Sequence, residues 1–231
     1  MSEIEEIKKR YGRRKTTAVK TVYSYFNTGN LFIVQERQRK ILGLLKQKGF
    51  ESLGDKAILD VGCGNGGWMR DFAQWGAKPE SLFGVDLLEE RIEEARRLSP
   101  NMSFTCASAE KMGFGNATFD LVIASTCFTS IFDGAMKGGI AKEILRVLKK
   151  DGLILWYDFR YNNPWNPDVK GIKKPEIIEL FRDCEYDFKS VTLAPPIVRF
   201  LAPISCLACE LLATIPFLKT HYLAVIRKKN K

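Results

Sequence analysis

Apolar residues along the chain fall into short runs and into longer stretches with a helical period. The short runs lie at residues 57–61, 81–86, 103–106, 117–125 and 152–159. Their length and β-prone composition predict five buried strands. Stretches with helical spacing alternate with them, at residues 68–76, 88–98, 139–152 and 174–184. This alternation predicts a mostly parallel sheet with helices on both faces.

The two ends of the pattern differ from its middle. Residues 30–48 predict an amphipathic helix that ends at Gly49. Residues 188–194 and 221–228 predict two last strands, and the segment 194–220 between them shows no helical crossover at the usual spacing. We therefore expect an antiparallel hairpin at one edge of a seven-stranded, doubly wound α/β sheet. The segment would form a helical insertion.

A glycine-rich loop, "ILDVGCGNGGW" at residues 58–68, follows the first predicted strand and opens a helix. In an open α/β sheet, ligands bind outside the carboxyl ends of the strands, where the free N–H groups of a helix start face them. Gly62, Gly64 and Gly67 also satisfy the G-x-G-x-x-G of nicotinamide enzymes. Asp60 at the strand end, the long helical preface and the lack of a hydride-transfer constellation argue against that interpretation.

The loop and the segments after it resemble a known family. "ILDVGCGNGGW" is similar to motif I of the class I S-adenosylmethionine (SAM)-dependent methyltransferases. "GVDLLEERIEEAR", "ASAEKMGFGNATFDLVIAS" and "EILRVLKKDGLILWYDF" resemble the family's next three core segments. The resemblance covers residues 57 to about 160 and favours the members that act on small molecules, lipids and sugars. It implies a Rossmann-like fold in one domain over residues 1–231, with an N-terminal helical cap (1–50), a SAM-binding core (57–160) and an apolar insertion or lid (194–220).

The resemblance assigns the cofactor to particular residues. These are Asp60, Gly62, Cys63, Gly64, Asp86, Leu87, Ser108, Ala109 and Ser125. The glycine loop would place its backbone against the methionine part, and Asp60 would take up the ammonium group. Asp86 would accept both ribose hydroxyls, since a carboxylate only accepts, and Leu87 would lie against the adenine. The alternatives are that Asp60 caps its loop and that Asp86 caps a helix.

The third loop departs from the family pattern. Many members carry an aspartate that meets the adenine amino group where this chain has Ser108. The Ser108 hydroxyl can still accept that bond, and the N–H of Ala109 can donate to the ring. Ser125 and Thr126 end the fourth predicted strand beside the expected methyl group, or simply satisfy the open strand end.

The general base is the least specified part of the site. His221 begins the last predicted strand, where a structural histidine is the favoured interpretation. The loop after the fourth strand, "TCFTSIFDG", contains no histidine. At the end of the fifth strand, Asp158, Arg160 and Asn162 are expected to converge on the cleft. Asp158 and Arg160 are therefore the catalytic candidates, with an ion pair between them or a loop cap as the structural alternative.

Composition and charge limit the partners. The chain has 231 residues, 45% of them hydrophobic, and a net charge of +9 with basic runs near both ends, "IKKRYGRRK" and "RKKNK". Such runs attract phosphates or anionic lipid head groups, but frayed, solvated termini are the favoured interpretation. Six cysteines without a signal peptide predict a reducing cytoplasm and no disulfide. Cys206 and Cys209 are interpreted as small buried helix residues, and no metal is expected.

The insertion bears on the acceptor. Residues 200–218 carry one charge, Glu210, and approach the length of a membrane span, but Pro203 and Pro216 argue against a simple span. A helical lid is favoured over an interfacial, peripheral membrane segment. An apolar flap over a SAM cleft fits a lipid or hydrophobic acceptor, and sugar hydroxyls remain an alternative. Tyr23 and its aromatic neighbours are expected to close the other side or to pack ordinarily.

These observations predict a SAM-dependent methyltransferase that modifies a small-molecule, glycan or lipid-linked acceptor, with oxygen as the favoured atom. The net charge keeps an RNA methyltransferase as one alternative. However, the N/D-P-P-Y/F motif of base amino methylation and a basic stripe interleaved with aromatic residues are both absent, so nucleic acid is disfavoured. The lack of a recognisable base keeps a second alternative, a SAM-binding partner subunit without activity. The oligomeric state is left open.

Overall fold

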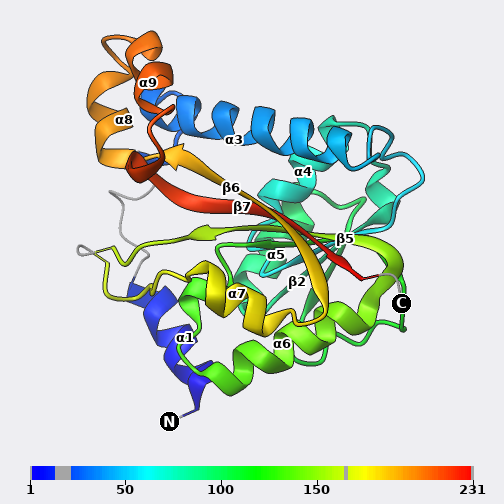
Figure 1. The fold of residues 1–231 in the computed structure, drawn as a ribbon. Helices are drawn as coiled ribbons and strands as arrows, with labels where there is room; N and C mark the ends of the chain where they lie inside the picture. The colour runs from blue at the N-terminus through cyan, green and yellow to red at the C-terminus, as the bar shows by residue number, and fades with distance from the viewer. Residues whose placement is uncertain (1, 14–21, 164–165, 230–231) are drawn as a thin grey trace.

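The computed structural model describes residues 2–13, 22–163 and 166–229. Its centre is one seven-stranded sheet with the order β3-β2-β1-β4-β5-β7-β6 (Figure 1). The strands are β1 (Ile58–Val61), β2 (Leu82–Asp86), β3 (Ser103–Cys106), β4 (Phe119–Ser125), β5 (Leu148–Phe159), β6 (Cys184–Leu193) and β7 (Lys219–Lys228). The pairs among β1 to β5 are parallel, whereas β7 runs antiparallel to both β5 and β6. The predicted mostly parallel sheet with an antiparallel edge hairpin is confirmed.

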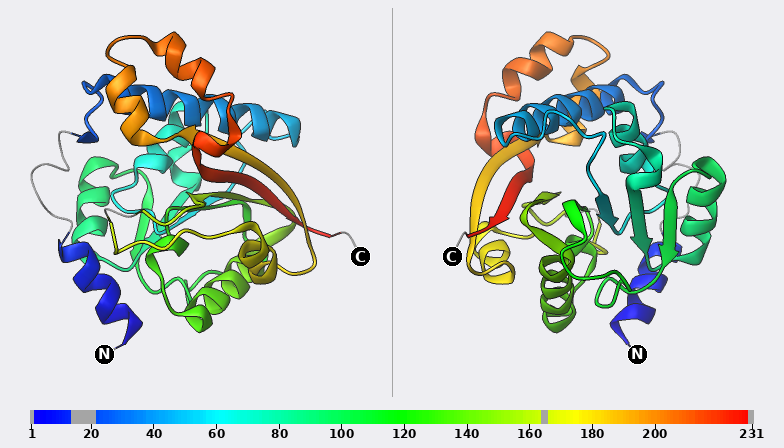
Figure 2. Two further views of the ribbon diagram at one scale, coloured as in Figure 1. Left: turned by 60° about the vertical axis from the view of Figure 1, so that its left-hand side comes forward. Right: turned by 90° about the vertical axis from the view of Figure 1, so that its right-hand side faces the viewer.

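Helices cover both faces of this sheet. They are α1 (Glu3–Arg13), α3 (Thr28–Gln47), α4 (Gly67–Gln74), α5 (Glu89–Leu98), α6 (Gly134–Val147), α7 (Lys174–Leu180), α8 (Pro195–Leu201) and α9 (Cys206–Leu212), with 3-10 turns η1 (Pro79–Ser81), η2 (Phe128–Ser130) and η3 (Pro216–Leu218). Figure 2 shows α3 and α4 on the side of the sheet opposite α6 and α7. The strands β1, β4 and β5 are buried between two apolar layers, and this burial is the main stabilising term of the fold.

Each layer is built from the amphipathic faces of its helices. On one side, Ile41 and Leu44 of α3 and Phe72 of α4 pack on the sheet without exposure. On the other side, Ile140 and Ile144 of α6 pack on β4 and β5. These layers hold the strand ends in place, so that the loops at the carboxyl ends can carry a site.

The fourth predicted helix differs from the sequence interpretation. We predicted a helix over 139–152 and a strand over 152–159, but α6 ends at Val147 and β5 begins at Leu148. Asp133 sets the earlier start, because its side chain accepts the N–H of Met136. The early end follows from Leu148, which is fully buried and pairs with Phe119 before the register of β4 and β5 shifts.

The segment between β6 and β7 forms the helices α8 and α9, which lie beside the start of α3 (Figure 1). Cys209 of α9 is buried in a small core shared with α3 and α8, but Cys206 is exposed, so the prediction that both are buried is wrong for Cys206. Among the described residues, no helix is long and apolar enough to cross a membrane.

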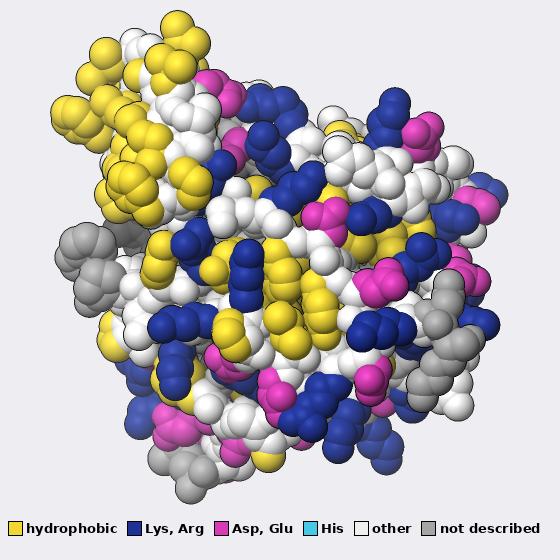
Figure 3. Space-filling view, in the orientation of Figure 1, with side chains coloured by type: hydrophobic (Ala, Val, Ile, Leu, Met, Phe, Trp, Pro, Cys, Tyr) yellow, Lys and Arg dark blue, Asp and Glu magenta, His cyan; other side chains and the backbone are white. Residues whose placement is uncertain are grey.

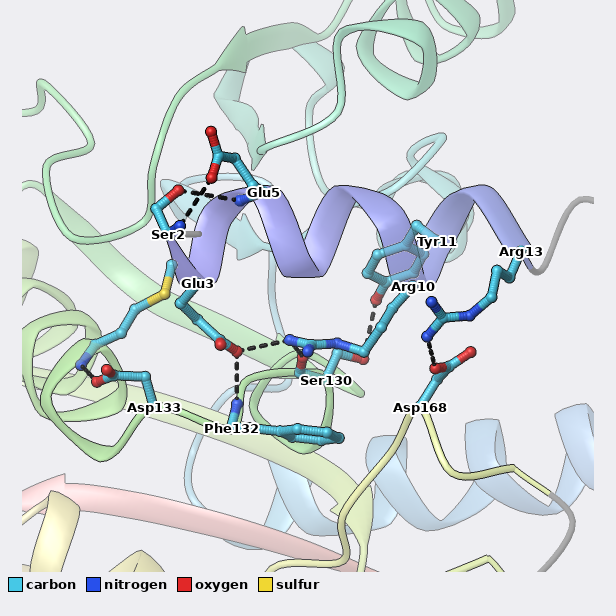
Figure 4. A network of polar contacts seen from close by, with 11 residues as sticks. Ser2, Glu3, Glu5, Arg10, Tyr11, Arg13, Ser130, Phe132, Asp133 and Asp168 are labelled. Atoms are coloured by element: carbon cyan, nitrogen blue, oxygen red, sulfur yellow. Dashed lines mark hydrogen bonds and ion pairs between the residues drawn. The ribbon is translucent and has the colours of Figure 1, made fainter.

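The N-terminal basic run is helical as far as Arg13, and its last two residues, 14 and 15, lie outside the described part of the chain. Residues 3–13 form α1, and the interpretation as a solvated end is wrong there because Ile7 and Arg10 are buried against the core. Figure 4 shows the contacts: Arg10 donates to the carbonyl of Ser130 at 3.2 Å and pairs with Glu3 at 2.6 Å. Tyr11 donates to the Ser130 hydroxyl at 3.1 Å. The helix is thereby tied to η2, at the carboxyl end of β4.

Candidate active site

The glycine loop after β1 is tied to the neighbouring strand. The N–H groups of Gly62 and Cys63 donate to the carbonyl of Val85 at 2.8 and 3.0 Å. Gly62 has a φ of +76°, and a Cβ there would lie 3.0 Å from the sulfur of Cys127. Only glycine combines that conformation with so close an approach. The loop therefore lies low against the sheet and leaves space above it.

Asp86 ends β2 and joins the loop to the next helix. One carboxylate oxygen accepts the N–H of Gly64 at 2.9 Å, and the other accepts the N–H of Leu88 at 2.9 Å. The second bond is the helix-start contact of the structural alternative. Each carboxylate oxygen has a second lone pair, so both retain capacity for a ligand hydroxyl.

Asp60 is the least satisfied polar side chain of the site. It is 1% exposed at the end of β1, and its Oδ1 has no hydrogen-bond partner among the described residues. Burial, and then the negative charge of Asp86, raises the pKa of Asp60 to about 8. A buried carboxyl group without a partner is costly, and a ligand cation would relieve that cost. The ammonium group of SAM is such a cation, so this end of the site fits the cofactor.

Two cavities of about 100 and 320 Å³ lie against the glycine loop, and both are lined by Gly62. The first is lined by Ile7, Tyr11, Gly62, Val85, Asp86, Leu87, Arg91, Ala109, Ser125, Thr126, Cys127, Ser130, Ile131, Met136 and Ile140. The second is lined by Asp60, Gly62, Cys63, Gly64, Asn65, Gly67, Trp68, Arg91, Glu94, Ser125 and Thr126. The first, more apolar one suits an adenosine, and the second, with Asp60, suits an amino acid.

The structure brings most of the predicted cofactor residues to these two cavities. Ser108 is the exception, because it is not among the described wall residues. Its hydroxyl instead accepts the N–H of Glu110 at 3.3 Å within its own turn. The neighbouring Ala109 does line the first cavity. The weak adenine contact expected from Ser108 therefore has no counterpart in this conformation.

A third and larger cavity, of about 630 Å³, opens beside the first two. Its described wall residues are Tyr11, Tyr23, Asn30, Ile33, Val34, Arg37, Trp68, Arg91, Ser125, Thr126, Thr129, Ser130, Tyr157, Phe159, Asn163, Asn166, Val169, Thr192, Pro195, Arg199 and His221. Arg91, Ser125 and Thr126 belong to the walls of all three cavities. A ligand in the third cavity would therefore meet a cofactor in the other two at the end of β4.

The proposed catalytic pair does not come together. Asp158 is buried and accepts bonds from the N–H and hydroxyl of Thr129 at 3.1 and 2.6 Å. Arg160 donates to Ser190 and Tyr161 instead, and Asn162 accepts the N–H of Gly171. Neither Asp158 nor Arg160 is among the described wall residues of the three cavities. Residues two apart on a strand point to the same face, but β5 ends at Phe159, so Arg160 lies beyond the strand and this alternation no longer aligns it with Asp158.

Asp158 acts as a support for the cavity wall. Burial raises its pKa to about 6, against the lowering effect of its bonds with Thr129. Thr129 lines the third cavity, so Asp158 positions a wall residue. This is the loop-cap alternative of the sequence analysis, and the alternative ion pair with Arg160 is not formed in the structure.

His221 lies in the wall of the third cavity, which the sequence did not indicate. Its ring stacks on Tyr157, with centroids 4.6 Å apart and planes 9° apart, and its Nδ1 lies 2.9 Å from the Thr220 hydroxyl. Burial, with Arg37 as a second cause, lowers its pKa to about 3, so the imidazole is neutral. Tyr157 hydrogen-bonds Thr192 at 2.8 Å, and burial raises its pKa to about 12.

Two further wall residues carried no recognisable sequence signal. Arg91 is a partly exposed residue of α5, and its guanidinium stacks on Tyr11 at 4.4 Å. Arg37 stacks on Trp68 at 4.6 Å. Both arginines are ordinary polar positions of amphipathic helices in the sequence, and only the packing of α1 and α3 around the sheet directs them to the cavities.

Comparison with known proteins agrees with this geometry. Residues 58–152 match the model of a family described as a methyltransferase domain. The match spans β1 to the first part of β5, and it contains the glycine loop and Asp86.

Two curated relatives each align with about half of this chain. The sterol 4-C-methyltransferase strm-1 of Caenorhabditis elegans is 36% identical over 120 residues, which are 48% of this chain and 34% of that protein. A phthiotriol/phenolphthiotriol dimycocerosates methyltransferase of Mycobacterium ulcerans (strain Agy99) is 30% identical over 127 residues, which are 52% of this chain and 44% of that protein. The chain thus matches less than half the length of either relative.

A solved structure extends the likeness beyond the matched segment. A putative type 11 methyltransferase from Sulfolobus solfataricus superposes with a TM-score of 0.58 over 85% of this chain and 94% of that one. The identity is 18%, so this likeness shows the fold.

Proposed function

We propose, from the premise that this chain belongs to the class I SAM-dependent methyltransferases, that it transfers a methyl group to a hydrophobic, lipid-type acceptor. The observation that carries the proposal is the junction at Ser125 and Thr126, which form part of the walls of all three cavities. Cofactor and acceptor would meet there. Holding two reactants in line supplies much of the rate of a displacement reaction.

The cofactor end rests on three side chains. SAM supplies a methyl group on a positively charged sulfur. Asp60 would pair with the ammonium group, and Asp86 would accept the ribose hydroxyls with the lone pairs it retains. Arg91 would meet the carboxylate, because its Nη1 lies 3.5 Å from the point where a Cβ of Gly64 would stand.

The acceptor end supports a lipid. The third cavity is larger than the first two together, and its walls include the apolar side chains of Ile33, Val34, Trp68 and Phe159. Apolar walls with a few polar groups are typical of small-molecule sites. The printed names of the two relatives refer to a sterol and to phthiotriol dimycocerosates, which also favours a lipid over a free sugar or RNA.

We propose oxygen as the acceptor atom, with His221 as the group that accepts the hydroxyl hydrogen bond. The neutral imidazole has lone-pair capacity, whereas Tyr157 stays protonated and serves as a donor. A pKa of about 3 makes His221 a weak base in the free protein, so bound acceptor would have to raise it. The printed name of one relative specifies methylation at carbon, which is the alternative outcome.

The proposal is tested with SAM that carries a labelled methyl group. We expect the protein, incubated with an extract of its source cells, to place label in the organic-soluble fraction. The Asp86→Ala variant should transfer none. Label in the RNA fraction would favour the RNA alternative. No transfer to any fraction, alongside normal binding of the demethylated cofactor S-adenosylhomocysteine (SAH), would favour a non-catalytic partner subunit.

We also propose that the outer surface of α8, α9 and η3 contacts a lipid bilayer. Five side chains of this apolar surface are 62–73% exposed, namely Phe200, Ile204, Leu207, Leu211 and Phe217. Figure 3 shows the apolar side chains gathered over these elements at the upper left. Isolated exposed apolar residues are ordinary, but a contiguous group marks an interaction site. Since Pro195 and Arg199 of α8 line the third cavity, a bilayer-bound acceptor could enter from this surface.

Vesicle co-sedimentation tests the bilayer contact. We expect the protein to sediment with vesicles of phosphatidylcholine and phosphatidylglycerol, because the apolar surface adds to a net charge of +9. A Phe200→Ser, Leu207→Ser, Phe217→Ser variant should stay in solution and bind SAH normally. Ile178→Ser, at an exposed apolar position of α7, is the matched control. If the triple variant sediments with vesicles to the same extent as the wild type, this surface does not make the bilayer contact.

A further inference from the structure

The third cavity has a marked imbalance of charge. Arg37, Arg91 and Arg199 are among its described wall residues, and no aspartate or glutamate is. Positive groups gathered in a partly enclosed, low-dielectric wall attract anions more strongly than they would in water. A purely neutral sterol-like or hydrocarbon acceptor would leave that potential unused.

Arg91 is accounted for by the cofactor. It lines both smaller cavities, lies near Gly64 and stacks on Tyr11. Arg37 and Arg199 line only the third cavity. They are therefore the positive groups that a molecule in the acceptor cavity would meet.

Arg37 has donors to spare. Its Nε is buried without a hydrogen-bond partner among the described residues, and its Nη2 forms an ion pair with Asp71 at 3.5 Å, at the limit of a hydrogen bond. Asp71 also accepts a bond of 3.1 Å from Gln38. The guanidinium is held flat by Trp68 and side-chain burial rather than by hydrogen bonds. An arginine carries five N–H donors in a fixed fork, and most of those of Arg37 have no acceptor among the described residues.

Arg199 lies across the cavity on α8. Its backbone packs against Gly29 at the start of α3, where an added Cβ would stand 2.8 Å from the Cα of Arg199. This close approach places the stem of the side chain beside the start of α3, and the residue as a whole is exposed. No carboxylate in the described part of the chain lies within ion-pair distance of Arg199. Its charge, like that of Arg37, lacks a strong internal partner.

We propose that the acceptor carries an anionic group, a phosphate or a carboxylate, and that Arg37 and Arg199 bind it in the third cavity. The proposal rests on the methyltransferase function proposed above and adds the chemical class of the acceptor. Guanidinium groups match the two oxygens of such anions in a bidentate geometry. The apolar part of the acceptor would lie against Ile33 and Val34 and toward the α8 surface.

Calorimetry with a matched set of probes tests this proposal. The probes are dodecyl phosphate, dodecanoate and dodecanol, all below their aggregation limits, and inorganic phosphate. In the presence of SAH, we expect the two anionic lipids to bind at least tenfold more tightly than dodecanol. Weaker binding of inorganic phosphate than of dodecyl phosphate would show that the alkyl chain of the probe contributes to affinity. Binding of inorganic phosphate as tight as that of dodecyl phosphate would mean a free anion site and would contradict the lipid-linked acceptor.

Variants separate the arginines from the rest of the site. Arg37→Gln and Arg199→Gln should each weaken dodecyl phosphate by about tenfold or more, since a charge-assisted hydrogen bond is lost. Arg37→Lys should recover part of the affinity. Arg39→Gln is the matched control, because Arg39 lies on the same helix, is half exposed and pairs with Glu210. SAH affinity should stay unchanged in all four variants.

The single histidine of the chain gives an independent readout. Arg37 is one of the causes that lower the pKa of His221. A bound anion would offset that charge, so dodecyl phosphate should raise the pKa of the imidazole in an NMR titration, and dodecanol should not. Suppose that SAH binds, that dodecyl phosphate and dodecanol bind equally tightly, and that neither Arg37→Gln nor Arg199→Gln changes the affinity for dodecyl phosphate. The proposal of an anionic acceptor is then wrong, while the methyltransferase proposal stands. If SAH itself fails to bind, the proposed function is wrong.

Discussion

Asp60 links the pH dependence of cofactor binding to one buried carboxyl group. Its pKa of about 8 means that it is mostly protonated at pH 7 in the free protein. An ammonium group beside it favours the charged form, so binding releases a proton and affinity rises with pH up to about 8. Between pH 6 and 7.5, we expect the affinity for SAH to rise with pH by up to about tenfold per pH unit, the limit for release of one proton.

Calorimetry in buffers of different ionisation enthalpy measures the released proton directly. The Asp60→Asn variant cannot release it, so its affinity should be weaker and flat over the same range. A wild-type profile as flat as that of the variant would show that Asp60 only caps its loop.

Asp86 is expected to matter both for the loop and for the ribose. In Asp86→Ala, Gly64 and Leu88 lose their acceptor and the cofactor loses charged hydrogen bonds. One such bond contributes about 1.5–3 kcal/mol, so the dissociation constant of SAH should rise by roughly ten- to a hundredfold. Glu93→Ala, at an exposed position of α5, is the control. Unchanged SAH affinity in Asp86→Ala, with a lower melting temperature, would leave Asp86 a helix cap alone.

His221 should make the folded protein less stable in acid. Its pKa is about 3 when folded and 6.5 in the unfolded chain, so between these values the unfolded state binds more protons. The stability that the neutral ring contributes is fully present above pH 6.5 and is lost as pH falls toward 3. The difference in unfolding free energy between wild type and His221→Phe should change by about 1.4 kcal/mol per pH unit between pH 4.5 and 6. Urea titrations at several pH values measure it, and a constant difference would mean that the ring is protonated when folded.

The residues of the site were predictable where a local motif fixes them. Asp60, Gly62 and Asp86 stand at strand ends or in a glycine turn, and such positions follow from the chain near them. Arg37 and His221 reach the acceptor cavity through packing between distant elements. A lone polar residue on an amphipathic helix or strand has many possible neighbours, so no local pattern indicates which it meets.

At the scale of elements, α1 is the main addition to the predicted fold. Its sequence, "EIEEIKKRYGR", has only Ile4, Ile7 and Tyr11 as apolar positions, and its charges resemble those of a solvated end. Tertiary contacts with Ser130 decide its placement. In contrast, strands and helices alternate several times from β1 to β5. This repeated pattern was enough to predict the sheet without knowledge of tertiary contacts.

The helix α1 should contribute to cofactor affinity. Tyr11 lines the first cavity and carries the stacked Arg91, and a cation–π contact of this kind is worth about 0.5–2 kcal/mol. Tyr11→Ala should therefore weaken SAH by roughly two- to thirtyfold, whereas Lys9→Ala, exposed on the same helix, should not. Fluorescence competition or calorimetry would show it. Equal affinities of the two variants would place α1 outside the cofactor site.

At the scale of the whole molecule, the cofactor residues and the residues of the third cavity come from different parts of the fold. The carboxyl ends of β1, β2 and β4 hold the glycine loop, Asp86 and the junction at Ser125. The antiparallel hairpin of β6 and β7, with α8 and α9 between its strands, brings His221 and Arg199 to the third cavity, the proposed acceptor site. The same hairpin carries the apolar surface proposed for the bilayer, so the proposed acceptor site and the proposed membrane contact belong to one element of the fold.

Calorimetric titration of the wild-type protein with SAH, and separately with NAD, tests the central claim most directly. The account predicts one SAH site per chain and no heat of binding for NAD, because the glycine loop, Asp60 and Asp86 together form a place for a methionine and an adenosine. Binding of NAD without binding of SAH would contradict it and would make the chain a dinucleotide-binding protein.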